Sequence, residues 1–320
     1  MKEKRVKTGS GGGKAQKLTF RQRCAKDWHK NWMLYLMILP ILIYYAIFKF
    51  GPMFGLSIAF LDYKPARGIL GSRFVGLKHF INFFTNYYFL RLLRNTIKIS
   101  LCSLLTFPCP IILALLLNEL RSAKFSKMAQ TVTYIPHFIS TVVVCSMVIV
   151  LTGSNGAITQ ILHTLFGVEE KAMLNNPAYF LPIYVLTELW QTLGWNSIIY
   201  LSALTGIDQQ LYEAARVDGA GRWQQTIHVT LPGIAPTIII MFILKMGKIF
   251  NVGYERVMLL YNDATLNVAD VINTYVYRQG IVQAQYSYST AVGLFNCLVS
   301  FGLVLLTNKI SNKLNGSGLW

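Results

Sequence analysis

Residues 206–222 read Gly206-Ile207-Asp208-Gln209-Gln210-Leu211-Tyr212-Glu213-Ala214-Ala215-Arg216-Val217-Asp218-Gly219-Ala220-Gly221-Arg222, and they lie between two long apolar runs. Asp208 can cap a short helix because its carboxylate accepts from free backbone donors. Apolar side chains then recur at helical spacing on one side, at Ile207, Leu211, Ala214 and Ala215. Gly219 can end the helix in the left-handed conformation. The pattern predicts a helix that docks on a partner protein or packs on its own bundle.

The composition of the chain favours lipid as its main solvent. Only 13% of its 320 residues are charged, 53% are hydrophobic, and the mean hydropathy is +0.43. Soluble domains carry about 25% charged residues. The net charge of +17 could indicate nucleic-acid binding, but ten of the basic residues precede the first apolar run. There they would face the cytoplasm and anionic headgroups, so we expect no nucleic-acid partner.

Apolar runs long enough to cross a bilayer predict an all-α integral membrane protein with six transmembrane helices. About 20 apolar residues are needed for one crossing. The predicted spans lie near residues 32–50, 96–117, 131–151, 180–204, 233–252 and 290–308. This divides the chain into a basic leader (1–31), a transmembrane domain (32–310) that contains the loop 205–232, and a tail (311–320).

The distribution of basic residues predicts that both termini are cytoplasmic. With that orientation the inner segments hold seventeen Lys and Arg and the outer segments nine, although six of those nine lie in the first outer loop. Within the leader, residues 8–14 are Gly-rich and expected to be disordered. Residues 18–32 mix aromatic and basic side chains, which is typical either of an interfacial helix or of a solvated tail.

Polar side chains inside the predicted spans indicate where a solute could pass. Pro108 and Pro110 should bend the second span, and such breaks are tolerated beside a water-filled cavity. The fourth span carries polar and aromatic residues at spacings of four, three and four, which predicts one stripe on one helix face. Aromatic rings and amides suit a carbohydrate. The candidate path residues are Tyr184, Glu188, Gln191, Trp195, Asn196, Lys245, Lys248, Asn251 and Asn296. Alternatively, Glu188 pairs with Lys245 or Lys248 and only joins two helices.

The loop also resembles a known family. Glu213-Ala214-Ala215, Gly219, Val229 and Leu231-Pro232 are spaced as in the EAA loop of binding-protein-dependent ABC importer permeases, with Val229 where Ile is more usual. The resemblance implies a type I ABC importer permease bundle, whose loop forms a cytoplasmic coupling helix seated in a cleft of a nucleotide-binding subunit. The implied ATPase-docking residues are Leu211, Tyr212, Glu213, Ala214, Ala215, Asp218, Gly219 and Ala220.

Further stretches are similar to the sugar and polysaccharide permeases related to the membrane subunits of the maltose transporter. They are residues 134–140, 194–201, 270–278 and 316–320. The resemblance implies a multi-pass protein of the bacterial plasma membrane that imports a carbohydrate. Its implied partners are a second homologous permease, one or two ATP-binding subunits, an extracellular solute-binding protein and the lipid bilayer.

The sequence contains no signature of an enzyme. Gly13-Lys14 is followed by Ala15 instead of Ser or Thr, so no phosphate loop is predicted, and ATP and Mg²⁺ would bind in the partner ATPase. His137 and His163 have no acid or Cys at ligand spacing, so we expect no metal site and no cofactor in this chain. The rival interpretations are an ion- or proton-coupled secondary transporter acting alone, supported by Glu188 and the two lysines, and a membrane-embedded enzyme or scaffold.

Overall fold

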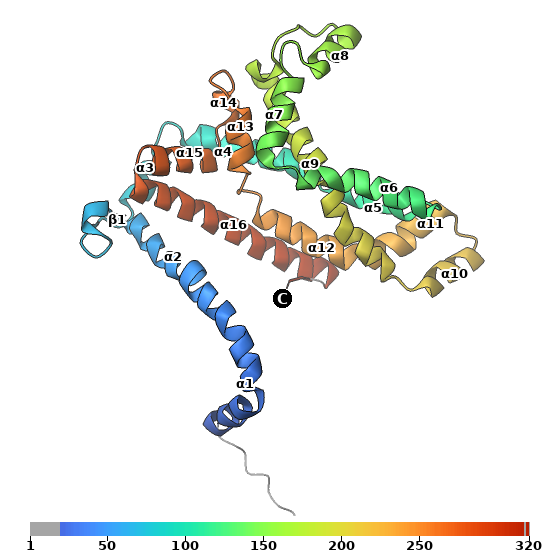
Figure 1. Ribbon diagram of the computed structural model, residues 1–320, viewed down its shortest axis with the longest axis horizontal. Helices are drawn as coiled ribbons and strands as arrows, with labels where there is room; N and C mark the ends of the chain where they lie inside the picture. Colours follow the sequence, from blue (N-terminus) through green and yellow to red (C-terminus); the bar gives the residue numbers. More distant parts are fainter. Residues whose placement is uncertain (1–19, 317, 320) are drawn as a thin grey trace, which may run out of the picture. The chain divides into compact units, whose positions relative to one another are not determined.

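Helices make up most of the protein in the computed structural model, which describes residues 20–316 and 318–319 (Figure 1). The Gly-rich part of the predicted leader therefore lies outside the described residues. The structure has two units, Met1–Ser57 and Ile58–Trp320.

The first unit contains the first predicted span. Its helices are α1 (Phe20–Tyr45), a π-helical turn (Ala46–Phe50) and α2 (Gly51–Met53), and a 3₁₀ helix (Phe54–Phe60) follows. Asn31 interrupts α1 with non-helical dihedral angles (φ −120°, ψ 21°). The kink separates the helical part of the leader from an apolar helix with exposed side chains, as expected of a helix that lipid surrounds.

The second unit begins with a small sheet that the all-α prediction missed. Strands β1 (Leu61–Asp62) and β2 (Arg73–Phe74) pair antiparallel, with Leu61 opposite Phe74. The intervening segment contains a 3₁₀ turn (Pro65–Arg67) and Gly68, whose φ of +66° suits a residue without a Cβ. Two-residue strands leave no periodic apolar pattern, which is why the sequence did not predict them.

The rest of the second unit is helical. Its first α-helices are α3 (Lys78–Phe84), α4 (Phe89–Leu105), α5 (Pro108–Asn118), α6 (Ala123–Tyr134), α7 (Thr141–Leu151), α8 (Ala157–Phe166) and α9 (Pro177–Thr205). The later ones are α10 (Gln209–Val217), α11 (Arg222–Gln225), α12 (Leu231–Gly247), α13 (Tyr254–Leu260), α14 (Leu266–Ala269), α15 (Ile272–Tyr277) and α16 (Tyr286–Asn315). Short 3₁₀ or π turns occupy Ile135–Phe138, Met173–Asn175, Thr226–Thr230 and Arg278–Val282.

In the described residues, four helices are long and apolar enough to cross a membrane. They are Lys30–Phe60, Phe89–Asn118, Arg222–Gly247 and Tyr286–Lys313, and a fifth span results if Ala123–Phe138 and Thr141–Leu151, bent by 98°, count as one. The predicted fourth span corresponds to α9, which is helical over 29 residues but is not among them. Its polar residues at 187, 188, 191, 192 and 196 reduce its hydropathy. Several membrane spans are thus found in the described residues, but the predicted count of six is not confirmed.

The predicted break in the second span is confirmed between α4 and α5. Pro108 and Pro110 have no backbone N–H to donate to the preceding turn. Around the break the backbone instead forms hydrogen bonds between residues three apart, as in a 3₁₀ helix. The Phe107 N–H donates to the Leu104 carbonyl, and the Cys109 N–H donates to the Thr106 carbonyl. The interruption leaves Thr106 and Phe107 beside α9 and α12, at the wall of the cavity described below.

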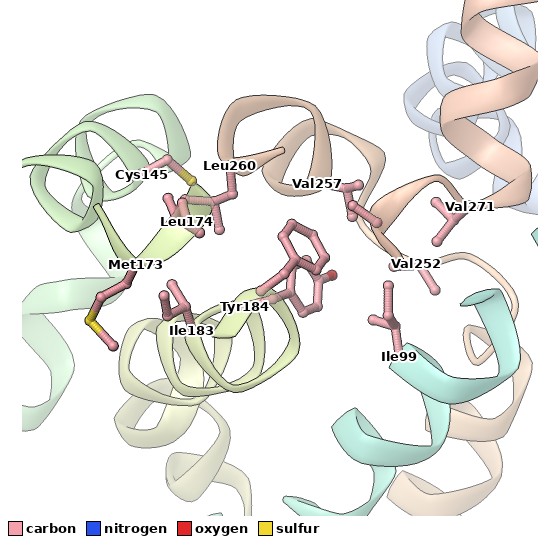
Figure 2. Close-up of a cluster of buried hydrophobic side chains, with 12 residues drawn as sticks. Ile99, Cys145, Met173, Leu174, Ile183, Tyr184, Val252, Val257, Leu260 and Val271 are labelled. Carbon is pink, nitrogen blue, oxygen red and sulfur yellow. The ribbon is translucent and has the colours of Figure 1, made fainter. Parts of the chain in front are cut away.

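Helix α9 is the centre of the packing in the second unit. It contacts α4, α5, α6, α7, α12, α13 and α14. Figure 2 shows one of its buried clusters, in which Ile183 and Tyr184 of α9 meet Leu174, Val257 and Leu260. The same helix contributes Tyr200 and Leu204 to a second cluster with Ile207 and Ile234. A polar helix placed among so many neighbours can direct its hydrogen-bonding groups away from lipid.

Gly194 allows α9 to lie against α6. A Cβ at this position would be 2.1 Å from the backbone oxygen of Thr133, which cannot move without its helix. We therefore expect Gly194→Ala to lower the free energy of unfolding by about 2 kcal/mol. Thermal unfolding of the purified protein in detergent would measure this. The matched control is Gly293→Ala in α16, where an added Cβ meets nothing within 4 Å. Equal destabilisation by both substitutions would contradict the close approach.

Candidate functional site

A cavity of about 440 Å³ lies between α4, α5, α9, α12 and the segment after α12. Both polar and apolar side chains line it, and the polar ones are Ser100, Ser103, Thr106, Tyr184, Glu188, Thr192, Asn196, Tyr200, Lys245, Lys248 and Asn251. Its volume is in the range of small-molecule sites, ~300–1,000 Å³.

Many of the predicted path residues meet at this cavity. Helix α9 contributes Tyr184, Glu188 and Asn196, while α12 and the segment after it contribute Lys245, Lys248 and Asn251. The residues from α9 follow each other at intervals of four, with Thr192 and Tyr200 completing the row. An i, i+4 row winds slowly around a helix, so the cavity wall follows α9 obliquely.

Gln191 and Trp195 lie on another side of α9, although the spacing predicted a single stripe. The Gln191 amide donates to the Ile139 carbonyl at 2.9 Å and accepts from Arg256 at 2.6 Å. The Trp195 ring stacks on His137, with centroids 4.4 Å apart and planes inclined by 7°. Both side chains thus contact the bent segment between α6 and α7, and neither lines the cavity.

Asn296 of α16 is also outside the cavity lining. Its amide donates to the side-chain oxygen of Asn273 at 2.8 Å and to the Phe250 carbonyl at 3.2 Å. Asn273 in turn donates to Asn251 at 2.7 Å. Asn296 therefore holds the segment that carries Asn251, and its connection to the cavity passes through Asn273.

Glu188 and Lys245 are joined through Ser103. The Ser103 hydroxyl donates to Glu188 Oε2 at 2.6 Å, and Lys245 Nζ donates to the Ser103 carbonyl at 2.8 Å. Within residues 20–316 and 318–319, no ion pair joins Glu188 to Lys245 or Lys248. The alternative of a direct Glu188–lysine pair is therefore not what this structure adopts.

Lys248 has an exposed side chain at the cavity, and its ammonium group makes no hydrogen bond or ion pair with the described residues. Lys245 and Lys248 together exceed the charge of Glu188, so the cavity has an excess of positive charge. An ammonium group that no protein partner neutralises can bind an anionic group of a ligand, and the nearby Asn196 and Asn251 amides can bind hydroxyls.

Only a small part of the Tyr184 ring lines the cavity. The side chain is only 1% exposed, because it lies in the apolar cluster at the centre of Figure 2. Arg256 lies 5.8 Å from the ring centroid, and a Cβ on Gly253 would be 3.7 Å from the hydroxyl. The ring faces are covered, so this tyrosine cannot stack on a sugar in the way the sequence led us to expect.

The predicted docking helix is α10, and its ends are built as the sequence indicated. The Asp208 carboxylate accepts from the Gln210 N–H at 3.0 Å. Gly219 has a φ of +78°, and the N–H groups of Gly219 and Ala220 donate to the carbonyls of Arg216 and Ala215. These two bonds form a Schellman motif, the usual closure of a helix by glycine.

One side of α10 packs on the bundle and the other is exposed. The Tyr212 hydroxyl lies 3.0 Å from Thr230 Oγ1, and its ring packs with Ile207 and Val229. Leu211 and Val217 are 53% and 88% exposed. Of the other predicted docking residues, the exposed ones are Glu213, Ala214, Asp218 and Gly219, and the half-buried ones are Ala215 and Ala220. Leu211 is thus on the exposed side, whereas the sequence had grouped it with buried Ile207.

The helix after α10 is tied to the end of α5. Arg222 NH1 lies 3.3 Å from Glu119 Oε2, and α11 lies beside this end of α5 (Figure 1). Trp223 is 75% exposed nearby. The exposed apolar groups of α10 and α11 leave a surface that a partner protein could cover.

The sequence missed a buried carboxylate near the start of α15. Asp270 accepts from Arg278 at 2.7 and 3.3 Å and from the Thr274 hydroxyl at 2.8 Å, and Arg91 of α4 lies 3.5 Å away. Its side chain is completely buried. The only local signal was an Asp and an Arg eight residues apart, which does not identify Arg91. No group of three His, Cys, Asp or Glu in the described part of the chain could hold a metal ion.

Comparisons with known proteins match most of the chain. The profile of the family described as "Binding-protein-dependent transport system inner membrane component" matches residues 107–313. The polygalacturonan/rhamnogalacturonan transport system permease protein YteP of Bacillus subtilis (strain 168) is 49% identical over 288 residues, which are 90% of each chain. Protein LplB of the same strain is 45% identical over 289 residues, covering 90% of this chain and 91% of LplB.

A solved structure is similar in fold as well. A chain in the crystal structure of a bacterial alginate ABC transporter, in complex with alginate pentasaccharide-bound periplasmic protein, superposes with a TM-score of 0.85 at 40% identity. The match covers 93% of the present chain and 100% of that chain.

Proposed function

The chain belongs to the family of binding-protein-dependent transport system inner membrane components, and on that basis we propose that it forms half of the path for an acidic oligosaccharide in an ATP-driven importer. It is a membrane permease and not an enzyme. The single observation that carries the substrate class is the ammonium group of Lys248, which has no partner among the described residues and lies at a cavity that also offers amides and hydroxyls.

The relatives support an acidic carbohydrate. YteP is named for polygalacturonan and rhamnogalacturonan, and the similar solved structures are importers of alginate, an acidic polysaccharide. Galacturonate carries a carboxylate on each sugar, and a lysine at a partly desolvated wall would bind that group through a charge-assisted hydrogen bond. Asn196, Thr192 and Asn251 would bind sugar hydroxyls. Gln191 and Trp195 would position the cavity wall and not contact the sugar.

The membrane arrangement that we propose has six spans, with α9 as the span that the apolar count omits. Its polar residues Glu188, Thr192 and Asn196 line the cavity, and a polar residue at membrane depth is tolerated there. Both termini and the loop 205–232 would be cytoplasmic, as the basic residues indicate. A second homologous permease would complete the path, and an extracellular solute-binding protein would deliver the sugar.

The energy would come from a partner ATPase that binds ATP and Mg²⁺ and docks on α10. Helix α10 is joined to α12 through the Tyr212–Thr230 contact and through Ile207, which lies against Gly233. The continuous helix Arg222–Gly247 then extends to Lys245 at the cavity. A displacement of α10 would therefore be transmitted along one continuous helix to the sugar path. This physical connection favours the importer over the ion-coupled secondary transporter.

Uptake by the reconstituted importer tests the substrate class. We expect Lys248→Ala to reduce uptake of trigalacturonate by about tenfold, because a charge-assisted bond is lost, with little effect on a neutral trisaccharide. Glu188→Ala should alter the uptake of both sugars, because Glu188 accepts the hydrogen bond that fixes the Ser103 hydroxyl at the cavity wall. The control is Lys171→Ala, which removes an exposed lysine outside the cavity. An equal response of acidic and neutral sugars to Lys248→Ala would refute an acidic substrate.

A further inference from the structure

A second cavity, of about 570 Å³, lies in the second unit and shares no lining residue with the first. Its walls come from β1, α3, the segment before α4, α15 with the π turn after it, and the start of α16, where tyrosine, amide and basic side chains gather together with the carboxylate of Asp62. None of these residues belongs to the proposed path. Under the predicted orientation they belong to the outer segments, the side from which solute arrives.

A hydrogen-bonded network of side chains forms a fixed wall of this cavity. The Tyr275 and Tyr288 hydroxyls lie 3.2 Å apart, and the Asn86 amide donates to them at 3.3 and 3.4 Å. Tyr288 and Tyr275 are buried in a cluster with Phe83. The backbone of Tyr63 donates to the Ser287 hydroxyl at 2.9 Å, which joins the strand segment to α16. The wall is therefore preorganised, which lowers the cost of binding a ligand.

Other polar groups at the same cavity have no protein partner. The side chains of Lys78, Asn82, Gln279 and Gln285 line it, and none makes a hydrogen bond or ion pair with the described residues. The Tyr63 and Tyr286 rings meet edge to face, with centroids 6.2 Å apart, and Tyr286 is 37% exposed. Ala284, which lines the rim, has a φ of +55°, an unusual conformation for a residue with a Cβ. Strained backbone of this kind concentrates at binding sites.

We infer that this cavity is a second carbohydrate site that binds one acidic sugar unit of the substrate before it enters the membrane path. Exposed tyrosine surface would pack against the C–H face of the sugar ring, and the Asn82 and Gln279 amides would bind its hydroxyls. Lys78 would bind the carboxylate. The inference rests on the proposed function, because it assumes that this protein handles acidic oligosaccharides, but it assigns them to a separate site.

Equilibrium dialysis of the full chain in nanodiscs with radiolabelled trigalacturonate tests the site, because it counts bound molecules per chain. We expect Lys78→Ala and Gln279→Ala each to raise the dissociation constant of one class of binding sites for trigalacturonate by about tenfold. Lys248→Ala should leave that class unchanged. The matched controls are Lys64→Ala and Gln283→Ala, which remove exposed side chains nearby that do not line the cavity.

The outcomes separate this inference from the proposed function. Unchanged binding in both cavity variants, with normal uptake of trigalacturonate, would overturn the second site and leave the importer assignment intact. No binding and no uptake by the wild type would refute the acidic substrate itself. Unchanged sugar binding, combined with lost association of the solute-binding protein in the Lys78→Ala and Gln279→Ala variants, would make this cavity a protein interface and also overturn the inference.

Discussion

Gly219→Pro is expected to abolish solute-stimulated ATP hydrolysis in the reconstituted importer, while the chain remains in the membrane. Gly219 has a φ of +78°, whereas proline requires a φ near −65°. Proline would also remove the N–H that donates to the Arg216 carbonyl at 3.0 Å. The closure of α10 would therefore be lost, and with it the geometry of the surface on which we propose that the ATPase docks. The ratio of stimulated to basal ATPase activity measures the effect.

Gly167→Pro is the matched control for this substitution. Gly167 also follows a helix, α8, in the left-handed conformation with a φ of +66°, and its N–H donates to the His163 carbonyl at 2.8 Å. The local damage is the same, but the position is distant in sequence from the docking helix. Full stimulation in Gly219→Pro, or equal loss in both variants, would contradict a specific docking role.

Glu213→Lys tests the same surface without changing the backbone. Glu213 is exposed on α10 and makes no ion pair with the described residues, so its replacement should leave the fold intact. We expect loss of stimulation because a charge of the wrong sign at a docked surface costs several kcal/mol. Glu170→Lys, an equal charge change at an exposed position after α8, is the control and should retain stimulation.

Asp270→Ala is expected to lower the free energy of unfolding by about 3 kcal/mol, the largest effect on stability that we predict. The buried carboxylate joins Arg278 to Arg91 of α4, and its removal leaves two arginines facing each other without a counter-charge. The side chains of these arginines are 30% and 25% exposed, so water would relieve part of the cost. Thermal and denaturant unfolding of the purified chain would measure the difference.

Two further variants show whether charge is the cause. Asp270→Asn keeps the shape and can still accept from the Thr274 hydroxyl, but it removes the counter-charge, so it should be nearly as destabilising as Asp270→Ala. Asp263→Ala removes an exposed acid that has no ion pair in the described part of the chain, and it should change stability by less than about 0.5 kcal/mol. A stable Asp270→Asn variant would indicate that packing, and not charge, is important here.

The candidate site was only partly predictable from sequence. Spacing on α9 identified Tyr184 and Glu188, which line the cavity, but it grouped them with Gln191 and Trp195, which do not. The error arises because residues at i, i+4 form a row that is inclined to the helix axis. The helices that cross α9 decide which of its residues face a cavity. Sequence spacing alone contains no information about that crossing.

The sequence by itself determined the local features of this protein. Asp208 caps α10, Gly219 closes it, and Pro108 interrupts the helix that precedes α5, because each effect acts within a few residues along the chain. The tertiary structure decided which partners the polar groups find. Ser103 separates Glu188 from Lys245, and Arg91 reaches Asp270 from a helix far away in sequence. Those pairings depend on how distant helices pack, because only packing brings their side chains within hydrogen-bonding distance.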